Sequence, residues 1–138
     1  CIRAAAADAR EKHAAWEGQA DVVMADVPCS GLGIIRKKPA IRYKNPKELA
    51  QLPLVQRAIL ENASGYVRPG GTLVYSTCTV LPEENEDFTG DFLDKHPEFE
   101  PVRTAFPLPV GPCPGQVTLW PQRHGTDGIY ICRMRRKD

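Results

Sequence analysis

Apolar positions along this chain follow two periods, and the change from one to the other marks the expected strands and helices. Residues 21–25 and 72–76 are short apolar runs, which are typical of strands buried on both faces of a sheet. Further strands are expected at residues 1–8, 98–102, 117–120 and 129–135.

Helices are predicted between these runs. Asn45-Pro46 suits the cap and first position of a short helix. Residues 53–67 then place apolar side chains three or four positions apart (Val55, Ile59, Ala63 and Tyr66), which predicts one buried stripe. Residues 82–96 form the next predicted helix, with Phe88 and Phe92 on its inner face.

This order of elements indicates a single domain of the α/β class with an antiparallel end. The proline-rich stretch 104–114 is expected to be irregular. Residues 1–138 begin with Cys1 and without a cap or turn signal, so we interpret them as part of a longer protein.

Composition excludes some classes of protein. The formal net charge of +1 favours no particular partner, and no apolar stretch approaches the roughly 18 residues of a membrane span. The cysteine count is odd and no pair has C-x-x-C spacing, so we expect no metal site and no disulfide framework. Free thiols favour a cytoplasmic location. Cys113 and Cys132 are interpreted as small buried apolar residues.

The segment Asp26-Val27-Pro28-Cys29 follows the first of the two buried runs. Pro28 cannot continue a strand, so the chain must turn there and leave Asp26 and Cys29 at the strand end. The following glycines, Gly31 and Gly33, would allow close backbone approach to a ligand. The alternative is a plain turn in which Asp26 bonds to its own backbone.

Cys78 lies in a similar position after the second buried run, within Ser76-Thr77-Cys78-Thr79. The ends of neighbouring parallel strands meet at one edge of a sheet, where ligands bind. We therefore expect Cys29, Cys78 and the Asp26 carboxylate to face one crevice. On its own, the Ser/Thr-rich segment would be read as a solvated loop.

Taken together, these segments resemble the RNA cytosine-C5 methyltransferases, and within them the bacterial Sun/Fmu branch that acts on 16S ribosomal RNA. The resemblance covers nearly the whole chain. Its motifs are Asp8-Ala9-Arg10, Asp26-Val27-Pro28-Cys29-Ser30-Gly31, Arg36-Lys37-Lys38-Pro39, Thr77-Cys78-Thr79, Leu81-Pro82-Glu83-Glu84-Asn85-Glu86 and Gly125-Thr126-Asp127-Gly128.

The resemblance implies a mechanism and a set of roles. Cys78 would add to C6 of a cytosine in RNA, after which C5 accepts a methyl group from S-adenosylmethionine, and Cys29 would serve the release step. Asp26 would hold the N3/N4 edge of the base. Asp8, Asp26 and Pro28 are expected to contact the cofactor. Because DNA cytosine methyltransferases attack with a Pro-Cys cysteine, the residues alone leave open which thiol attacks.

The resemblance also implies a truncated Rossmann-like methyltransferase sheet, in which this chain supplies strands 4-5-7-6 and a remnant of strand 3, with strand 7 antiparallel. The chain would then be the C-terminal portion of one catalytic domain. No glycine-rich cofactor loop occurs in it. We expect residues 1–7 to be frayed or re-docked, the 21–25 strand to be a bare edge, and the chain alone to bind cofactor weakly.

The stretch from Arg36 to Lys47 is strongly basic and directly follows the Cys29 loop. Arg36, Lys37, Lys38 and Arg42 are expected to contact RNA phosphates. The alternative is a solvated charged loop. For the protein as a whole, the other functions considered are a transfer RNA methyltransferase of the same family and a non-catalytic RNA-binding remnant.

Overall fold

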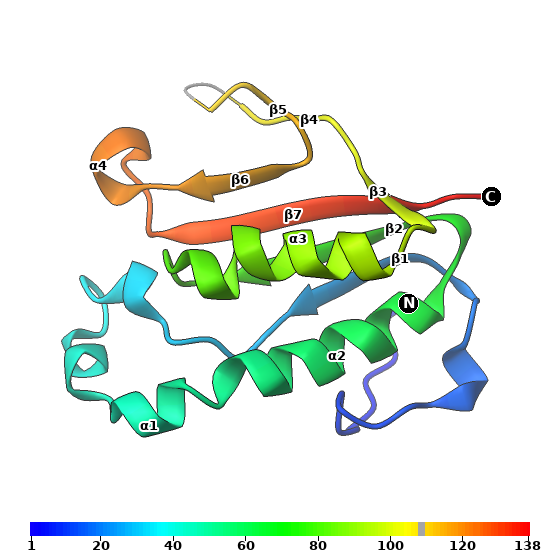
Figure 1. Ribbon diagram of the computed structural model, residues 1–138, viewed down its shortest axis with the longest axis horizontal. Coiled ribbons are helices and arrows are strands. Elements are labelled where there is room, and N and C mark those ends of the chain that lie inside the picture. Colours follow the sequence, from blue (N-terminus) through cyan, green and yellow to red (C-terminus); the bar gives the residue numbers. More distant parts are fainter. Residues whose placement is uncertain (108–109) are drawn as a thin grey trace.

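Five strands form the central sheet in the computed structural model of the chain, which describes residues 1–107 and 110–138 (Figure 1). The strand order is β1 (Ala20–Asp26), β2 (Val67–Thr77), β7 (Ile129–Arg136) and β3 (Phe99–Pro101), and β6 (Gln116–Leu119) also pairs with β7. β1 and β2 run parallel, whereas β7 is antiparallel to β2, β3 and β6. The predicted α/β class and antiparallel end are confirmed, and the numbering of these strands within a longer sheet stays a prediction.

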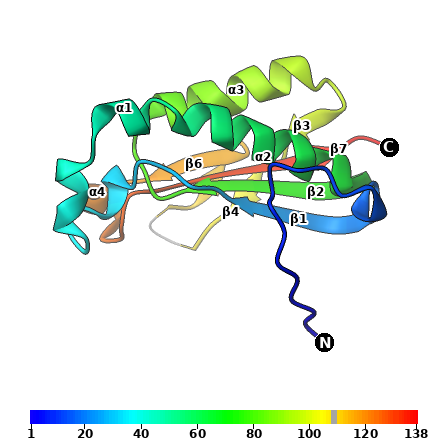
Figure 2. The same ribbon diagram turned by 90° about the horizontal axis from the view of Figure 1, so that it is seen from below.

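The strand predicted at residues 1–8 is wrong. These residues form neither helix nor strand, and all of them are exposed. Figure 2 shows the N-terminal segment extending away from the sheet on the side opposite the helices. In the described part of the chain no strand lies beside residues 1–8 to accept their backbone hydrogen bonds, so they do not form the remnant of strand 3.

β1 forms one edge of the sheet within the described residues, as expected. The expectation that it is buried on both faces is wrong, because Val22 is 62% exposed and Met24 is 69% exposed. Their neighbour Ala25, whose side chain alternates to the other face, is buried. The reason is that the helices cover one face of the sheet and leave the other face of β1 open (Figure 2).

The helices are α1 (Pro46–Leu49), α2 (Leu52–Tyr66), α3 (Glu86–Lys95) and α4 (Pro121–His124). Single turns of 3-10 helix occur at Ala14–Trp16, Leu32–Ile34, Pro39–Tyr43 and Pro82–Glu84. Asn45 caps α1 as expected, since its side chain accepts a hydrogen bond from the backbone N–H of Lys47. None of the helices in the described residues is long and apolar enough to cross a bilayer.

The buried face of α2 differs from the predicted stripe. Gln56, Leu60, Ala63 and Ser64 are its buried residues, so Ala63 alone belongs to both sets. A polar side chain, Gln56, thus occupies a fully buried position that apolar periodicity cannot identify. The amide nitrogen of Gln56 makes two hydrogen bonds, described below, which favour this position, whereas its buried Oε1 has no partner among the described residues.

The core lies between this helical layer and the covered face of the sheet. Tyr75 of β2 stacks on Phe88 of α3 with ring centroids 5.2 Å apart, and Phe92 lies 5.7 Å from Phe99. The predicted inner face of the 82–96 helix is therefore confirmed. These rings are almost completely buried and supply much of the apolar area that stabilises the fold.

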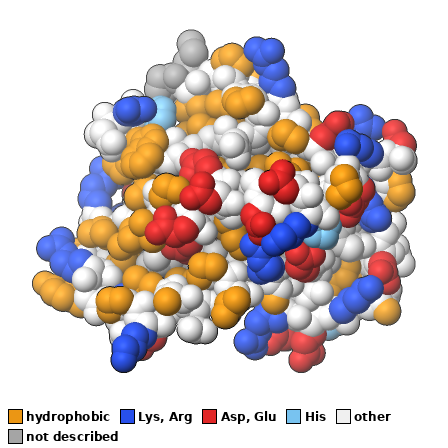
Figure 3. All heavy atoms as spheres, in the orientation of Figure 1, with side chains coloured by type: hydrophobic (Ala, Val, Ile, Leu, Met, Phe, Trp, Pro, Cys, Tyr) orange, Lys and Arg blue, Asp and Glu red, His pale blue; other side chains and the backbone are white. Residues whose placement is uncertain are grey.

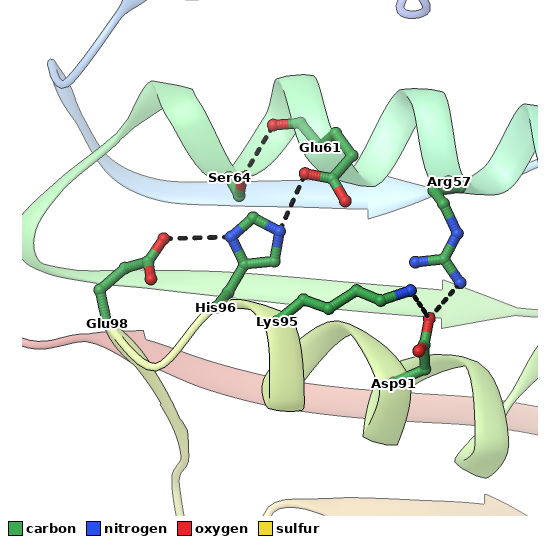
Figure 4. Close-up of polar contacts among 7 residues, drawn as sticks. All are labelled: Arg57, Glu61, Ser64, Asp91, Lys95, His96 and Glu98. Carbon is green, nitrogen blue, oxygen red and sulfur yellow. Dashed lines mark hydrogen bonds and ion pairs between the residues drawn. The ribbon is translucent and has the colours of Figure 1, made fainter.

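Polar contacts join α2 to α3 at the surface of this layer (Figure 4). Arg57 of α2 pairs with Asp91 of α3 at 2.6 Å, and His96 Nε2 lies 2.9 Å from Glu61 of α2. Acidic side chains gather over the middle of this face in Figure 3, where α3 lies. That charge makes this face an unfavourable surface for RNA.

The segment 104–114 is less irregular than expected. β4 (Thr104–Ala105) pairs with β5 (Pro112–Cys113) in a small antiparallel ladder. Residues 108 and 109 of this segment lie outside the described residues.

Candidate active site

The parallel pairing of β1 with β2 brings the two cysteine loops to the same edge of the sheet. Asp26 is in register with Ser76, and the backbone N–H of Val27 donates to the Ser76 carbonyl beyond the last paired residues. Cys29 lies three residues after the end of β1 and Cys78 directly after the end of β2, on the loops that leave these strands. Their proximity is therefore a consequence of strand register.

The sulfur atoms of Cys29 and Cys78 lie 3.1 Å apart, and both residues are half-buried. The backbone N–H of Cys78 also donates to the Cys29 sulfur at 3.2 Å. Burial, together with the hydrogen bond to Cys78, raises the pKa of Cys29 to about 12. Cys29 is therefore a neutral thiol at pH 7.

Asp26 lies between two hollows of the surface. One hollow, of about 480 Å³, is lined by Asp8, Pro28, Val55 and Ile59 among others, and the second, of about 320 Å³, is lined by Ser76, Cys78, Ile129 and Ile131 among others. Asp26 and Met24 line both. The exposed Asp26 carboxylate accepts a hydrogen bond from the Ser76 hydroxyl at 2.9 Å, which orients it at this boundary.

The larger hollow contains Asp8, Asp26 and Pro28, the residues expected to contact the cofactor. Its volume is in the range of small-molecule sites, and aliphatic side chains form part of its wall. The Asp8 carboxylate is engaged by Arg10, whose Nε and Nη2 donate at 3.0 and 2.6 Å. This hydrogen bonding lowers the pKa of Asp8 to about 2, so Asp8 is ionised at neutral pH.

Gly33 makes a close backbone contact within the chain, and the predicted approach of a ligand to this loop stays a prediction. A Cβ at Gly33 would lie 1.9 Å from the carbonyl oxygen of Gly128, so only glycine fits. The N–H of Gly33 donates to the Cys78 carbonyl, and the N–H of Gly128 donates to the Gly33 carbonyl. The backbone of Gly33 thus links the Cys78 loop to the 125–128 segment. Sequence reasoning missed this contact because it joins distant positions.

The four predicted RNA-binding residues divide into two pairs. Arg36 and Lys37 form ion pairs with Asp127 at 3.6 and 2.5 Å, and Lys37 and Arg36 keep the pKa of that carboxyl below its ordinary value. Lys38 and Arg42 are exposed and have no ion-pair partner among the residues that the structure describes. In that part of the chain, the charges of Lys38 and Arg42 are therefore available to a phosphate or to solvent, whereas those of Arg36 and Lys37 are already engaged by Asp127.

The remaining candidates behave as packing residues. Cys132 is fully buried in β7, where burial raises its pKa to about 11, and Cys113 is half-buried. Among residues 1–107 and 110–138, no cluster of three or more His, Cys, Asp or Glu side chains could hold a metal ion.

Comparison with known proteins identifies the family of this chain. The model of the family described as 16S rRNA methyltransferase RsmB/F matches residues 2–135. The chain belongs to this family. It is 41% identical, over 99% of its length, to the probable ribosomal RNA small subunit methyltransferase B of Bacillus subtilis. It is 40% identical, over 86% of its length, to ribosomal RNA small subunit methyltransferase B of Thermus thermophilus. It spans 32% and 30% of these two relatives.

Solved structures give the same fold. The crystal structure of the protein PH0851 matches 87% of this chain with a TM-score of 0.79 and 37% identity, and the match covers 27% of that protein. The crystal structure of NSun6 from Pyrococcus horikoshii with SFG matches 87% of the chain with a TM-score of 0.68 and 28% identity, over 31% of its own length.

Proposed function

We propose that the protein to which this chain belongs methylates C5 of a cytosine in 16S ribosomal RNA through a covalent bond between Cys78 and C6. The observation that carries this proposal is the pair of sulfur atoms 3.1 Å apart, beside a carboxylate that borders two hollows. The larger hollow suits the cofactor and the smaller one a pyrimidine ring. The names of the curated relatives support ribosomal RNA as the substrate.

Cys78 is the proposed nucleophile. It lines the smaller hollow, whereas Cys29 does not, and the raised pKa of Cys29 keeps that sulfur protonated. Since only a thiolate attacks, Cys29 is the poorer candidate. Addition of the Cys78 sulfur to C6 moves the ring electrons to C5, which can then bond to a methyl group.

Asp26 and Cys29 have supporting roles. Asp26, which accepts a hydrogen bond from Ser76, would in turn accept hydrogen bonds from the N4 amino group and a protonated N3, and the protonated N3 would draw electrons from C6 as the sulfur adds. After methyl transfer, C5 loses its proton to a base or to water, the ring double bond re-forms and the bond from Cys78 to C6 breaks. Cys29, 3.1 Å away, can donate a hydrogen bond to the departing sulfur.

S-adenosylmethionine is the proposed source of the methyl group. SFG, which accompanies the NSun6 structure, is an analogue of it. The aliphatic side chains of Val55 and Ile59 would contact the adenine, Pro28 would contact the cofactor in the same hollow, and Asp26, which lines both hollows, would lie between the cofactor and the base. For Asp8 to bind the cofactor, its carboxylate must share or release Arg10.

We also propose that residues 1–138 are the C-terminal portion of the catalytic domain, and that the protein acts in the cytoplasm. Part of the wall of the larger hollow is formed by residues 7–10 of the N-terminal segment, which are exposed and belong to no helix or strand. The chain alone should therefore bind S-adenosylmethionine weakly. Calorimetry giving micromolar affinity for residues 1–138 would contradict this.

The test is to trap the full-length protein with RNA containing 5-fluorocytosine, because fluorine at C5 cannot leave as a proton and the covalent adduct persists. Cys78→Ser should form no adduct, whereas Cys29→Ser should still form one. Cys113→Ser, another half-buried cysteine away from the site, is the matched control and should behave as the unchanged protein.

Two results would overturn the proposal. Loss of the adduct in Cys29→Ser and not in Cys78→Ser would exchange the roles of the two thiols. Intact RNA binding without any adduct in the unchanged full-length protein would instead indicate a non-catalytic RNA-binding protein.

A further inference from the structure

The two cysteine loops are joined by buried hydrogen bonds that do not involve sulfur. Ser30, which follows Cys29, donates from its hydroxyl to the hydroxyl of Thr79, which follows Cys78, at 2.7 Å. Both Ser30 and Thr79 are fully buried. The residues next to the cysteines therefore hold one loop directly against the other.

Glu84 holds the Cys29 loop. Its carboxyl oxygen Oε2 accepts from the backbone N–H of Ser30 at 3.0 Å and from the side-chain amide of Gln56 at 2.7 Å. The same amide nitrogen donates to the Pro28 carbonyl at 3.0 Å. Glu84, which is 3% exposed, thus holds the peptide group after Cys29 directly through Ser30. It holds the peptide group before Cys29 through Gln56, which bonds to the Pro28 carbonyl.

Asn85 holds the Cys78 loop in the same manner. Its Oδ1 accepts from the hydroxyl of Thr77 at 2.6 Å, and its Nδ2 donates to the carbonyl of Thr79 at 3.1 Å. The bonded residues are the two neighbours of Cys78. Asn85 is fully buried, so these hydrogen bonds are shielded from water.

These two clamping residues are adjacent in the chain and fixed to the core. The Tyr75 hydroxyl donates to the Glu84 carbonyl at 2.8 Å, and the Asn85 carbonyl accepts from the first turns of α3 through the N–H and hydroxyl of Thr89. A movement of either cysteine loop away from Glu84 and Asn85 must therefore break hydrogen bonds to two residues whose backbones are held by β2 and α3. Glu84 and Asn85 contact neither sulfur through these bonds, which is the arrangement of positioning residues.

We propose that Glu84, Asn85 and Gln56 form a clamp that sets the separation of the Cys29 and Cys78 sulfurs and the aim of Cys78. Glu84 positions the Cys29 loop through Ser30, and Asn85 positions the Cys78 loop. Gln56 couples α2 to the Glu84 carboxyl group. The catalytic part of this inference rests on the proposed function, whereas the separation of the sulfurs does not.

Two near-isosteric variants separate the halves of the clamp. Glu84→Met keeps the length of the side chain but removes Oε2, so Ser30 and Gln56 both lose their acceptor. Asn85→Asp keeps the acceptor for Thr77 and turns the donor to the Thr79 carbonyl into an acceptor. Glu86→Met is the matched control, since Glu86 lies at the same helix start but accepts its hydrogen bond from Thr118 of β6.

The tendency of Cys29 and Cys78 to form a disulfide can be measured, and it depends on how closely the two sulfur atoms are held. In a glutathione redox buffer the two thiols lose their protons, and two electrons pass to glutathione disulfide, which becomes two glutathione thiols. Oxidised full-length protein is quantified by alkylation and peptide mass mapping. Because a bond needs the sulfurs about 2 Å apart, holding them close favours it.

We expect Glu84→Met and Asn85→Asp to require at least about tenfold more oxidising buffer for half-oxidation, with Glu86→Met within about twofold of the unchanged protein. With fluorocytosine RNA at saturating concentration, the two clamp variants should also form adduct about tenfold or more slowly, while their RNA affinity is kept. A general loss of structure would weaken RNA binding as well, so circular dichroism and RNA affinity are measured for every variant.

Folded clamp variants with an unchanged or more readily formed disulfide would overturn the inference. Adduct rates equal to that of the unchanged protein would overturn its catalytic part. If the unchanged protein forms no adduct but the disulfide equilibrium shifts as expected, the clamp is supported and the proposed function fails. If one clamp variant does not fold, the other decides the outcome, because each acts on a different loop.

Discussion

Replacing Gly33 by alanine should damage both the fold and the site. The added Cβ would lie 1.9 Å from the Gly128 carbonyl oxygen and 2.6 Å from its carbon. An ordinary contact of this kind is about 3.3 Å or longer, so the two backbones must separate by more than about 1 Å. The separation weakens the hydrogen bonds from Gly128 to Gly33 and from Gly33 to the Cys78 carbonyl, which measure 2.8 and 3.0 Å.

The expected loss is about 3 kcal/mol of unfolding free energy, from two hydrogen bonds at about 1 kcal/mol each and at least about 1 kcal/mol of overpacking. Urea unfolding followed by circular dichroism measures it. Gly65→Ala is the matched control: Gly65 lies in α2, with no atom of the described residues within 4 Å of its Cβ position apart from its chain neighbours and the helix backbone. That variant should gain about 0.5–1 kcal/mol. A loss below about 1 kcal/mol in Gly33→Ala would refute the reasoning.

Three further predictions concern the core, the thiols and the basic loop. Phe92→Ala should lose about 3–5 kcal/mol in urea unfolding because the ring is 1% exposed; a loss under about 1 kcal/mol would contradict its place in the core. Burial and Cys78 raise the pKa of Cys29 to about 12, so its alkylation should rise about tenfold per pH unit from pH 8 to 10; a plateau near pH 9 would show an ordinary thiol. Lys38→Ala and Arg42→Ala in the full-length protein should each lower the salt dependence of RNA binding by about one counterion, and unchanged slopes would remove them from the RNA surface.

The sequence supports a correct prediction of the elements that carry the site. Each strand end is marked locally, by Pro28 after β1 and by the polar segment around Cys78 after β2, so the cysteine loops could be placed at one edge of the sheet. The periodicity of the 82–96 helix also places Phe88 and Phe92 in the core, since apolar spacing reflects burial on one face.

Contacts between distant polar residues could not be predicted in this way. Gln56 is buried because its amide meets Glu84 and Pro28, which lie 28 positions away, and no local pattern encodes that meeting. Gly33 likewise depends on Gly128. The exposure of Val22 depends on which face of the sheet the helices cover, whereas its apolar character alone suits either face.

The most direct test of the account is to identify the residue that carries the nucleotide in the fluorocytosine adduct. The unchanged full-length protein is trapped on its RNA, digested with protease and nuclease, and mapped by mass spectrometry. Our account predicts a pyrimidine attached to the Cys78 sulfur, on a peptide distinct from the one that contains Cys29. Attachment at Cys29, or at a cysteine outside this pair, would contradict it.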